Sequence, residues 1–173
     1  LGKYGDTLVV DWGLAMPIDR DDSARASGEQ TLMPTSGSGT SSSGSSGGPV
    51  GTPAYMPPEQ ASGIPNLTPA CDIFSLGATL YKLLVGQAPY TGDTLTRARY
   101  GSFTAPREIN SDVPVGLDAI CRKAMAIDPA SRYLSASEIA DDIERWLADE
   151  PIQARKETRL ECCGRWIRHH REW

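Results

Sequence analysis

One short stretch near the start of the chain carries side chains that could bind a metal ion. Asp11-Trp12-Gly13 directly follows the apolar residues Leu8-Val9-Val10. A carboxylate at a strand end, with a glycine that frees the backbone behind it, can reach a hard cation. The same pattern is also typical of a solvated acid in a turn. These residues alone leave both interpretations open.

A second stretch is rich in hydroxyl groups. Every residue of TSGSGTSSSGSSGG, at positions 35–48, is Ser, Thr or Gly. Such a run cannot bury enough apolar surface to offset the entropy lost on ordering, so we expect it to be disordered. By itself the run could be a linker between two domains or a mobile loop inside one domain.

The overall composition excludes several classes of protein. The chain has 173 residues, enough for one domain, and its apolar content of 39% allows a sizeable core. A net charge of −5 argues against a general nucleic-acid binder. No run of 18 or more apolar residues is present, so no membrane span is expected. The four cysteines match no zinc or disulfide spacing, which favours reduced thiols.

The sequence predicts β-structure before the Ser/Gly run and helices after it. Residues 1–16 predict a β-hairpin, which is marginally stable alone and must pack on something else. After the run the pattern is helical. Because a hairpin that cannot fold alone precedes a helical bundle, we expect the two to form one unit. The Ser/Gly run is then an excursion from that unit.

The predicted helices have recognisable ends. Thr68 as N-cap and Pro69 at the first helical position predict the start of a helix that is apolar on nearly all sides, as in a central buried helix. Gly86 predicts its end. Gly77 inside this helix suggests close packing there. GDTLTRARYG predicts a short exposed helix, and VPVGLDAICRKAMAIDP predicts an amphipathic one. SASEIADDIERWL opens with a capping box.

Four motifs then follow one another in a characteristic order: Asp11-Trp12-Gly13, GTPAYMPPEQ, CDIFSLGATLYKLLVGQAPY and DPASRY. Their order and spacing resemble the second half of a bacterial serine/threonine protein kinase domain, from Leu1 to about Ala148. The resemblance implies a mainly α fold, namely the helical C-terminal lobe of the kinase fold with a short β-hairpin at its N-terminus. It places this lobe at residues 1–149 and an activation segment at residues 11–59, with the Ser/Gly run as an insertion.

The resemblance also implies roles for individual residues. In this family the Asp of the Asp-Phe-Gly motif holds the Mg²⁺ that bridges the ATP phosphates, so Asp11 and Gly13 become the candidate cofactor-binding residues. Trp12 replaces the usual Phe. Thr52 stands where relatives steady the catalytic Asp and the substrate hydroxyl, which favours serine/threonine specificity. A simple turn residue is the alternative interpretation of Thr52.

Three further residues take structural roles by resemblance. Glu59 stands for the Glu of the family's Ala-Pro-Glu motif, and Arg132 for the Arg that pairs with it in a buried ion pair. The motif here reads Pro57-Pro58-Glu59, which is a mild departure. Asp72 resembles the acid that hydrogen-bonds the backbone of the catalytic loop. An Asp in the first turn also suits the helix dipole, and both readings of Asp72 can hold.

Kinases switch by ordering the activation segment, often through phosphorylation and pairing with Arg. We therefore expect phosphorylation in the Ser/Gly run, with a passive spacer as the alternative. The candidate phosphorylation sites are Thr40, Ser41, Ser42, Ser43, Ser45 and Ser46.

The implied function is transfer of the ATP γ-phosphoryl group, with Mg²⁺, to Ser or Thr hydroxyls of protein substrates. The alternative is a pseudokinase or a helical protein-interaction module. Because the resemblance places Leu1 just after the family's catalytic loop, we expect the chain to be a fragment that is inactive alone.

The tail, residues 150–173, ends in the basic and aromatic run RWIRHHREW. Such a run could lie near an anionic membrane surface, and bacterial kinases of this kind often continue into a transmembrane helix. Contact with RNA is the alternative, which the acidic balance of the chain disfavours. We expect a cytoplasmic kinase domain, with attachment to the inner membrane through sequence downstream of Trp173 as one option.

Overall fold

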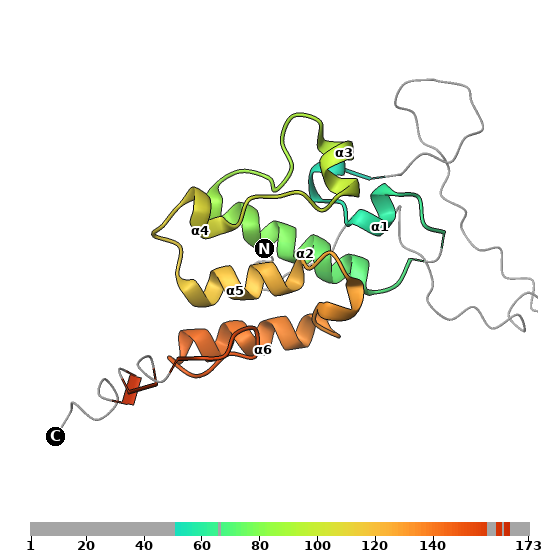
Figure 1. Cartoon of the computed structure of the whole chain (residues 1–173). Coiled ribbons are helices and arrows are strands. Elements are labelled where there is room, and N and C mark those ends of the chain that lie inside the picture. The colour runs from blue at the N-terminus through green and yellow to red at the C-terminus, as the bar shows by residue number, and fades with distance from the viewer. Residues whose placement is uncertain (1–50, 66, 159–161, 164, 167–173) are drawn as a thin grey trace, which may run out of the picture. The chain divides into compact units, whose positions relative to one another are not determined.

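Figure 1 shows the chain as a computed structural model, which describes residues 51–65, 67–158, 162–163 and 165–166. The chain divides into two units, Leu1–Gly51 and Thr52–Trp173, and almost all described residues lie in the second. Within the described ranges the second unit is helical and contains no strand. The expected mainly α class is therefore confirmed, whereas the expected hairpin at residues 1–16 lies outside the described residues.

The helical unit contains three longer helices and several short ones. In chain order they are η3 (Pro53–Tyr55), α1 (Pro58–Ala61), α2 (Ala70–Val85), α3 (Thr94–Arg99), α4 (Pro106–Ile109), α5 (Val115–Ala124), η4 (Pro129–Ser131) and α6 (Ala136–Leu147). Helix α5 packs against α2 on one side and α6 on the other (Figure 1). The short helices α1 and α3 pack on each other, and η3 contacts both α2 and α3.

Helix α2 ends as the sequence predicts but begins differently. Gly86 has a φ of 85° and its N–H donates to the Lys82 carbonyl at 2.7 Å, so the helix stops in a left-handed conformation that glycine adopts without strain. At the other end, the predicted cap by Thr68 is wrong. Pro69 is the N-cap, no side chain caps the helix, and the Thr68 carbonyl accepts from the Cys71 N–H at 2.9 Å.

Burial of α2 is one-sided among the described residues. Its buried residues are Cys71, Ile73, Phe74, Gly77, Ala78 and Tyr81. Leu76 and Leu83, however, are 42% and 79% exposed. The expectation of a helix buried on all sides is therefore wrong here, because the neighbouring helices of this unit cover only part of its surface.

Glycine lets α2 and α5 approach closely, as the sequence predicts. A Cβ atom on Gly77 would lie 2.7 Å from the Cβ of Ala124 and 2.9 Å from the Cγ of Met125. Gly116 on α5 has the same role toward α6, since its Cβ would lie 2.6 Å from Cδ1 of Trp146. The three longer helices are thus held together by contacts that a larger side chain would prevent.

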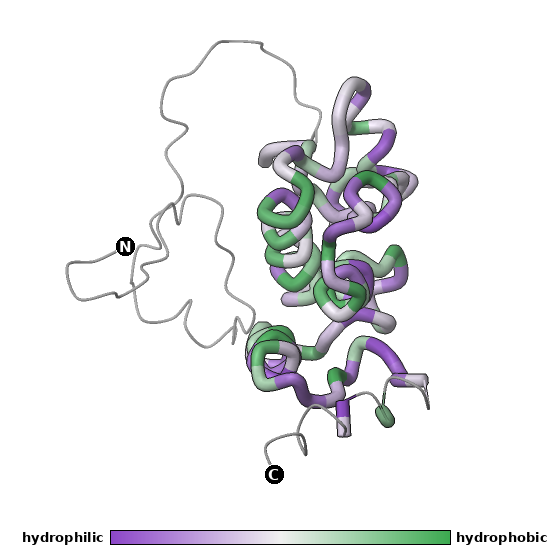
Figure 2. The backbone as a smooth tube through the Cα atoms, turned by 90° about the vertical axis from the view of Figure 1, so that its left-hand side faces the viewer, coloured by the Kyte–Doolittle hydropathy of each residue, from purple (hydrophilic) through white to green (hydrophobic). Residues whose placement is uncertain are grey.

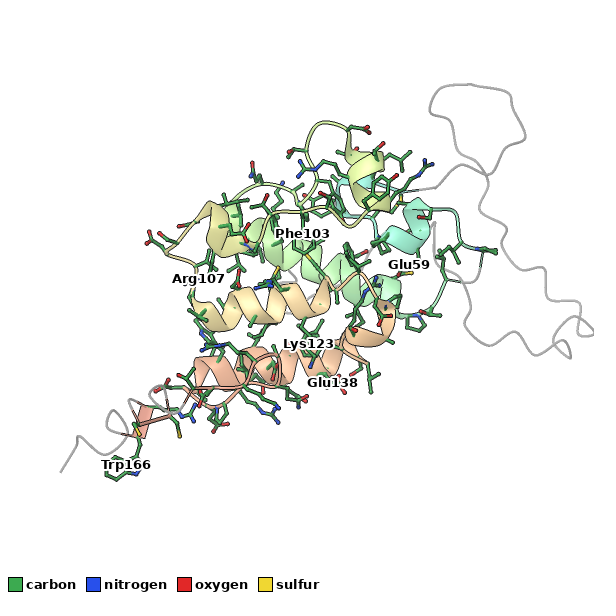
Figure 3. All side chains as sticks on the ribbon, in the orientation of Figure 1. Glu59, Phe103, Arg107, Lys123, Glu138 and Trp166 are labelled. Carbon is green, nitrogen blue, oxygen red and sulfur yellow. The ribbon has the colours of Figure 1, made fainter. Side chains whose placement is uncertain are left out.

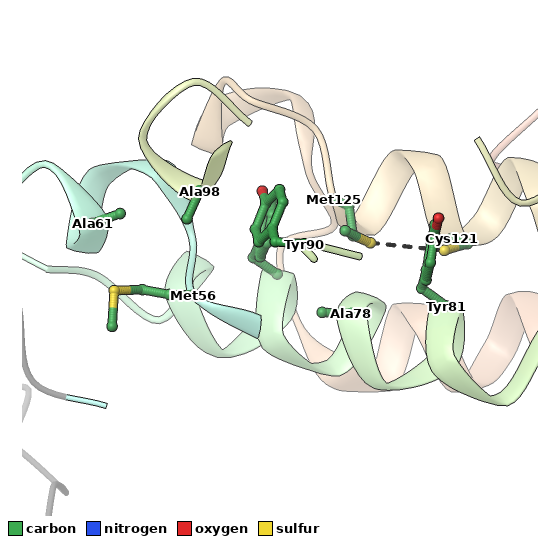
Figure 4. Packing of buried hydrophobic residues seen from close by; sticks show 9 residues of the cluster. Met56, Ala61, Ala78, Tyr81, Tyr90, Ala98, Cys121 and Met125 are labelled. Atoms are coloured by element: carbon green, nitrogen blue, oxygen red, sulfur yellow. Dashed lines mark hydrogen bonds between the residues drawn. The ribbon is translucent and has the colours of Figure 1, made fainter. Parts of the chain in front are cut away.

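The interior forms two apolar clusters. The first joins α1, α2, α3 and α5 and contains Met56, Ala61, Phe74, Ala78, Tyr81, Tyr90, Ala98, Cys121 and Met125 (Figure 4). The second joins α2, α5 and α6 and contains Ile73, Ile120, Ala124, Tyr133 and Ile139. Apolar and polar residues alternate along the helices, as expected for helices that bury one side (Figure 2).

Polar contacts fix helix α6 at its first turn and at its middle. The Ser135 hydroxyl accepts from the Glu138 N–H at 3.3 Å, and the Glu138 carboxylate accepts from the Leu134 N–H at 2.9 Å, which confirms the predicted helix start. Beyond α6, the backbone N–H groups of Gln153 and Ala154 donate to the buried Asp142 carboxylate at 2.7 and 2.8 Å. The segment after α6 therefore folds back onto this helix.

Candidate functional site

Four of the predicted site residues lie in the described part of the chain, namely Thr52, Glu59, Asp72 and Arg132. Asp11 and Gly13 lie outside it. The same holds for the candidate phosphorylation sites Thr40, Ser41, Ser42, Ser43, Ser45 and Ser46. Within the described ranges, no group of three or more His, Cys, Asp or Glu side chains could hold a metal ion.

Thr52 is exposed, but the backbone that follows it is anchored in the core. It is the N-cap of the 3₁₀ turn η3, and its carbonyl accepts from the Tyr55 N–H at 3.1 Å. Pro53 fits the first position of this turn, where no N–H is needed. Met56 is only 3% exposed, and Tyr55 packs against the first cluster. Thr52 is thus an exposed residue next to a backbone that core packing holds.

Glu59 and Arg132 form a two-pronged ion pair. Arg132 Nη1 donates to Glu59 Oε1 at 2.7 Å, and Nη2 donates to Oε2 at 2.9 Å. Glu59 lies in the first turn of α1, and Arg132 follows η4 (Figure 3 labels Glu59). The Arg132 side chain is fully buried and that of Glu59 is 12% exposed. Parallel bonds between a guanidinium and a carboxylate are among the strongest polar contacts in proteins.

The Arg132 guanidinium uses all five of its N–H groups. Besides the two bonds to the carboxylate, Nε donates to the Ala126 carbonyl at 2.8 Å, Nη1 to the Ala70 carbonyl at 2.7 Å and Nη2 to the Ile127 carbonyl at 3.2 Å. The Phe74 ring centre lies 4.9 Å from its central carbon. Arg132 therefore joins α1, the start of α2 and the loop after α5.

The charges of this pair stabilise each other. Burial alone would raise the pKa of Glu59, but the hydrogen bonds and positive charge of Arg132, together with a backbone hydrogen bond at Glu59 and the Cys71 thiol, outweigh burial and hold that pKa below its usual value. A buried ion pair is worth little where its atoms lack partners. Here every N–H donor of the Arg132 guanidinium has an acceptor. The pair therefore connects α1 to the start of α2 and to the loop after α5 without leaving a buried donor unpaired.

Cys71 is a third member of this cluster, which sequence reasoning missed. Its Sγ donates to Glu59 Oε1 at 3.3 Å, and the residue is 8% exposed. Burial and the nearby Glu59 carboxylate raise the pKa of the Cys71 thiol to about 11, so the thiol stays protonated at neutral pH. The available signal was its place on the helical face that also carries Phe74 and Ala78, the buried face of α2.

Asp72 lies apart from the Glu59–Arg132 pair. It is exposed in the first turn of α2, where a negative charge suits the helix N-terminus. No side-chain hydrogen bond of Asp72 is found within the part of the chain that the structure describes. Of the four predicted residues, the structure thus brings together Glu59 and Arg132.

Tyr90 is a second residue that the sequence did not single out. It is 1% exposed, and its hydroxyl has no hydrogen-bond partner among the described residues. Burial raises the pKa of this phenol above its usual value. A buried hydroxyl without a hydrogen-bond partner lowers the free energy of unfolding, so the Tyr90 hydroxyl should destabilise the folded state.

The family model and the relatives that match this chain are all described as protein kinases. The family model described as "Protein kinase domain" matches residues 5–146. The chain is 33% identical over 158 residues to "Serine/threonine-protein kinase PknD" of Chlamydia felis, a match that covers 87% of this chain and 16% of that protein. It is 36% identical over 159 residues to the protein of the same name from Protochlamydia amoebophila, covering 85% of this chain and 15% of the relative.

A third relative carries a related name. "Probable serine/threonine-protein kinase PknB" of Bifidobacterium longum is 34% identical over 147 residues, covering 83% of this chain and 19% of that protein. The chain thus spans less than a fifth of the length of each of these three relatives.

Proposed function

The chain belongs to the protein kinase domain family, and from this premise we propose that the protein transfers the γ-phosphoryl group of ATP to Ser or Thr hydroxyls of protein substrates. The observation that carries the proposal is the match itself. Relatives named serine/threonine-protein kinases align with 83–87% of this chain, and the family model spans residues 5–146, which include Asp11, Thr52, Glu59 and Arg132.

In this proposal Thr52 orients the hydroxyl that accepts the phosphoryl group. Phosphoryl transfer depends mostly on positioning and on charge stabilisation, because the protein performs little covalent chemistry. Two features support the role: the Thr52 side chain is exposed, and the backbone from Tyr55 to Met56 is held by the core. A threonine hydroxyl on a fixed backbone can donate or accept one hydrogen bond at a constant position.

The Glu59–Arg132 pair keeps that backbone in place. Glu59 lies a few residues after Thr52, and Arg132 connects it to α2 and to the loop after α5. We propose that this pair, rather than local helix propensity, holds the end of the substrate-facing segment. The four-residue helix α1 is too short to be stable by itself.

Kinases of this family use ATP and Mg²⁺, and the metal neutralises charge that develops on the transferring phosphoryl group. We propose Asp11 as the Mg²⁺ ligand and Gly13 as the residue that frees the backbone beside the phosphates. The support is chemical: a carboxylate after an apolar strand is a suitable ligand for a hard cation.

We further propose that residues 11–59 are the activation segment and that the run at residues 35–48 accepts phosphoryl groups. The support is its six hydroxyl residues between Thr40 and Ser46, flanked by glycines that allow a kinase to reach them. Phosphopeptide mass spectrometry of the active full-length protein tests this. If no phosphate is found between Thr31 and Thr52, the run is only a spacer.

The proposed partners are protein substrates and ATP, and the proposed location is the cytoplasm, where ATP is available. We propose residues 150–173 as a connection toward the inner membrane. The 62% exposed Trp166 in this tail is a residue type that suits a membrane interface, whereas the nearby Arg165 is paired with Glu157. No helix in the described part of the chain is long and apolar enough to cross a bilayer.

The test compares two threonine variants of the full-length protein. Thr52→Ala should lower transfer to a protein substrate about a hundredfold, because a misplaced acceptor costs this much. Thr79→Ala is the matched control, since the hydroxyl of the exposed Thr79 donates to the Ser75 carbonyl of its own helix at 2.9 Å and has no other partner among the described residues. If both variants transfer like the wild type, Thr52 does not orient the acceptor. A folded protein without any transfer would favour the pseudokinase alternative.

A further inference from the structure

Two consecutive residues at the start of α2 hold the two members of the ion pair separately. The Ala70 carbonyl accepts from Arg132 Nη1 at 2.7 Å, and the Cys71 thiol donates to Glu59 Oε1 at 3.3 Å. The ion pair is therefore fixed to the first turn of α2 on both its cationic and its anionic side.

The two oxygens of the Glu59 carboxylate are not equivalent. Among side-chain donors of the described residues, Arg132 Nη2 donates to Oε2, whereas both Arg132 Nη1 and the Cys71 thiol donate to Oε1. Arg132 defines the plane of the carboxylate. A third donor from another element removes the remaining freedom of the group relative to α2.

We propose that Cys71 is a positioning residue, whose S–H···O bond fixes the Glu59 carboxylate and through it the segment Thr52–Pro58. This inference rests on the proposed kinase function, because that segment would face the acceptor substrate. Only the Glu59 side chain separates the Cys71 thiol from the backbone of this segment. Glu59 directly follows Pro58, and the Glu59 backbone carbonyl accepts from the Ile64 N–H at 3.0 Å.

The surroundings of Cys71 suit a permanent hydrogen-bond donor rather than a reactive thiol. The residue is buried, and its thiol faces a carboxylate, which disfavours the thiolate. An uncharged thiol adds a donor to a site where a second cation would compete with Arg132. A serine hydroxyl would keep the donor, whereas alanine and valine would remove it.

Enzyme kinetics of the full-length protein provide the first arm of the test. Cys71→Ala and Cys71→Val should raise KM for a protein substrate about fivefold, in line with the loss of one ordinary hydrogen bond from a weak thiol donor, and leave KM for ATP unchanged. Cys71→Ser should stay within about twofold of the wild type, because it keeps a donor. If valine restores wild-type KM and serine does not, Cys71 acts only by packing and the proposal is wrong.

Hydrogen exchange provides a second arm that does not need activity. Amides of Tyr55, Met56, Ala61 and Ile64 donate hydrogen bonds in or near η3 and α1. They should exchange about fivefold faster in the alanine and valine variants than in the serine variant and the wild type. Equal exchange in all four proteins overturns the positioning role. If the wild type transfers no phosphate, the proposed function fails, while the exchange pattern still decides whether Cys71 positions Glu59.

Discussion

Glu59 and Arg132 lie 73 residues apart in the chain and share two hydrogen bonds of 2.7 and 2.9 Å. The contact connects the segment that contains Thr52 to the helices that form the core. These two parts of the chain are far apart in sequence, so only noncovalent contacts hold them together. The first predictions therefore concern this pair.

Replacing Arg132 by Lys should lower the free energy of unfolding by at least about 2 kcal/mol, because an ammonium group has three donors for five acceptors. The measurement is denaturant unfolding of the full-length protein. Arg122→Lys is the matched control. Arg122 is 63% exposed and lies 3.9 Å from Asp118, so its replacement should change stability by less than about 0.5 kcal/mol. An equal effect of both variants would contradict the structural role of Arg132.

Lowering the pH should remove the stabilisation of the fold by the Glu59–Arg132 pair. Since the pKa of Glu59 is lowered in the folded state, its stabilisation is fully present above the unfolded-state pKa near 4.5 and is lost as the pH falls through the folded-state pKa. The difference in Tm between the wild type and Glu59→Gln should therefore be constant near neutral pH and shrink below about pH 4. A difference that grows as the pH falls would have the wrong sign.

Removing the Tyr90 hydroxyl should not harm the fold. Tyr90→Phe should leave the free energy of unfolding unchanged or raise it by up to about 1 kcal/mol, because the hydroxyl is buried without a partner among the described residues. Tyr133→Phe is the contrasting control. The Tyr133 hydroxyl donates to Asp142 Oδ2 at 2.7 Å, so this variant should lose about 1–3 kcal/mol. Thermal or chemical unfolding of both variants checks the order.

A methyl group at Gly77 should destabilise the α2–α5 contact, although alanine favours helices. Gly77→Ala gains up to about 1 kcal/mol in helix propensity but places Cβ 2.7 Å from the Cβ of Ala124, an overpacking cost of about 1–3 kcal/mol. Adding Ala124→Gly should relieve the clash and recover part of the loss. If Gly77→Ala alone is stabilising by chemical denaturation, the helices do not approach as closely as described.

Much of the fold could be predicted from local sequence signals. Gly86 ends α2 and Ser135 caps α6 because each acts within one helical turn, which a pattern of neighbouring residues reveals. The close packing at Gly77 was also expected, since a glycine inside a helix needs a compensating contact.

Other features depend on residues that are far apart in the chain. No sequence periodicity indicates the hydrogen bond from Cys71 to Glu59. The same holds for the bonds that Gln153 and Ala154 donate to Asp142. Exposure of Leu83 was missed for a similar reason, because apolarity on all sides of a helix does not say which neighbours are present. The roles of Asp11, Thr52 and the Ser/Gly run remain predictions from the family resemblance.

Phosphoamino-acid analysis tests the central claim most directly. The full-length protein would be incubated with radiolabelled ATP, Mg²⁺ and a protein substrate, and the product hydrolysed. We expect phosphoserine or phosphothreonine in the substrate. A folded protein that gives no labelled product, or only phosphotyrosine, would contradict the account.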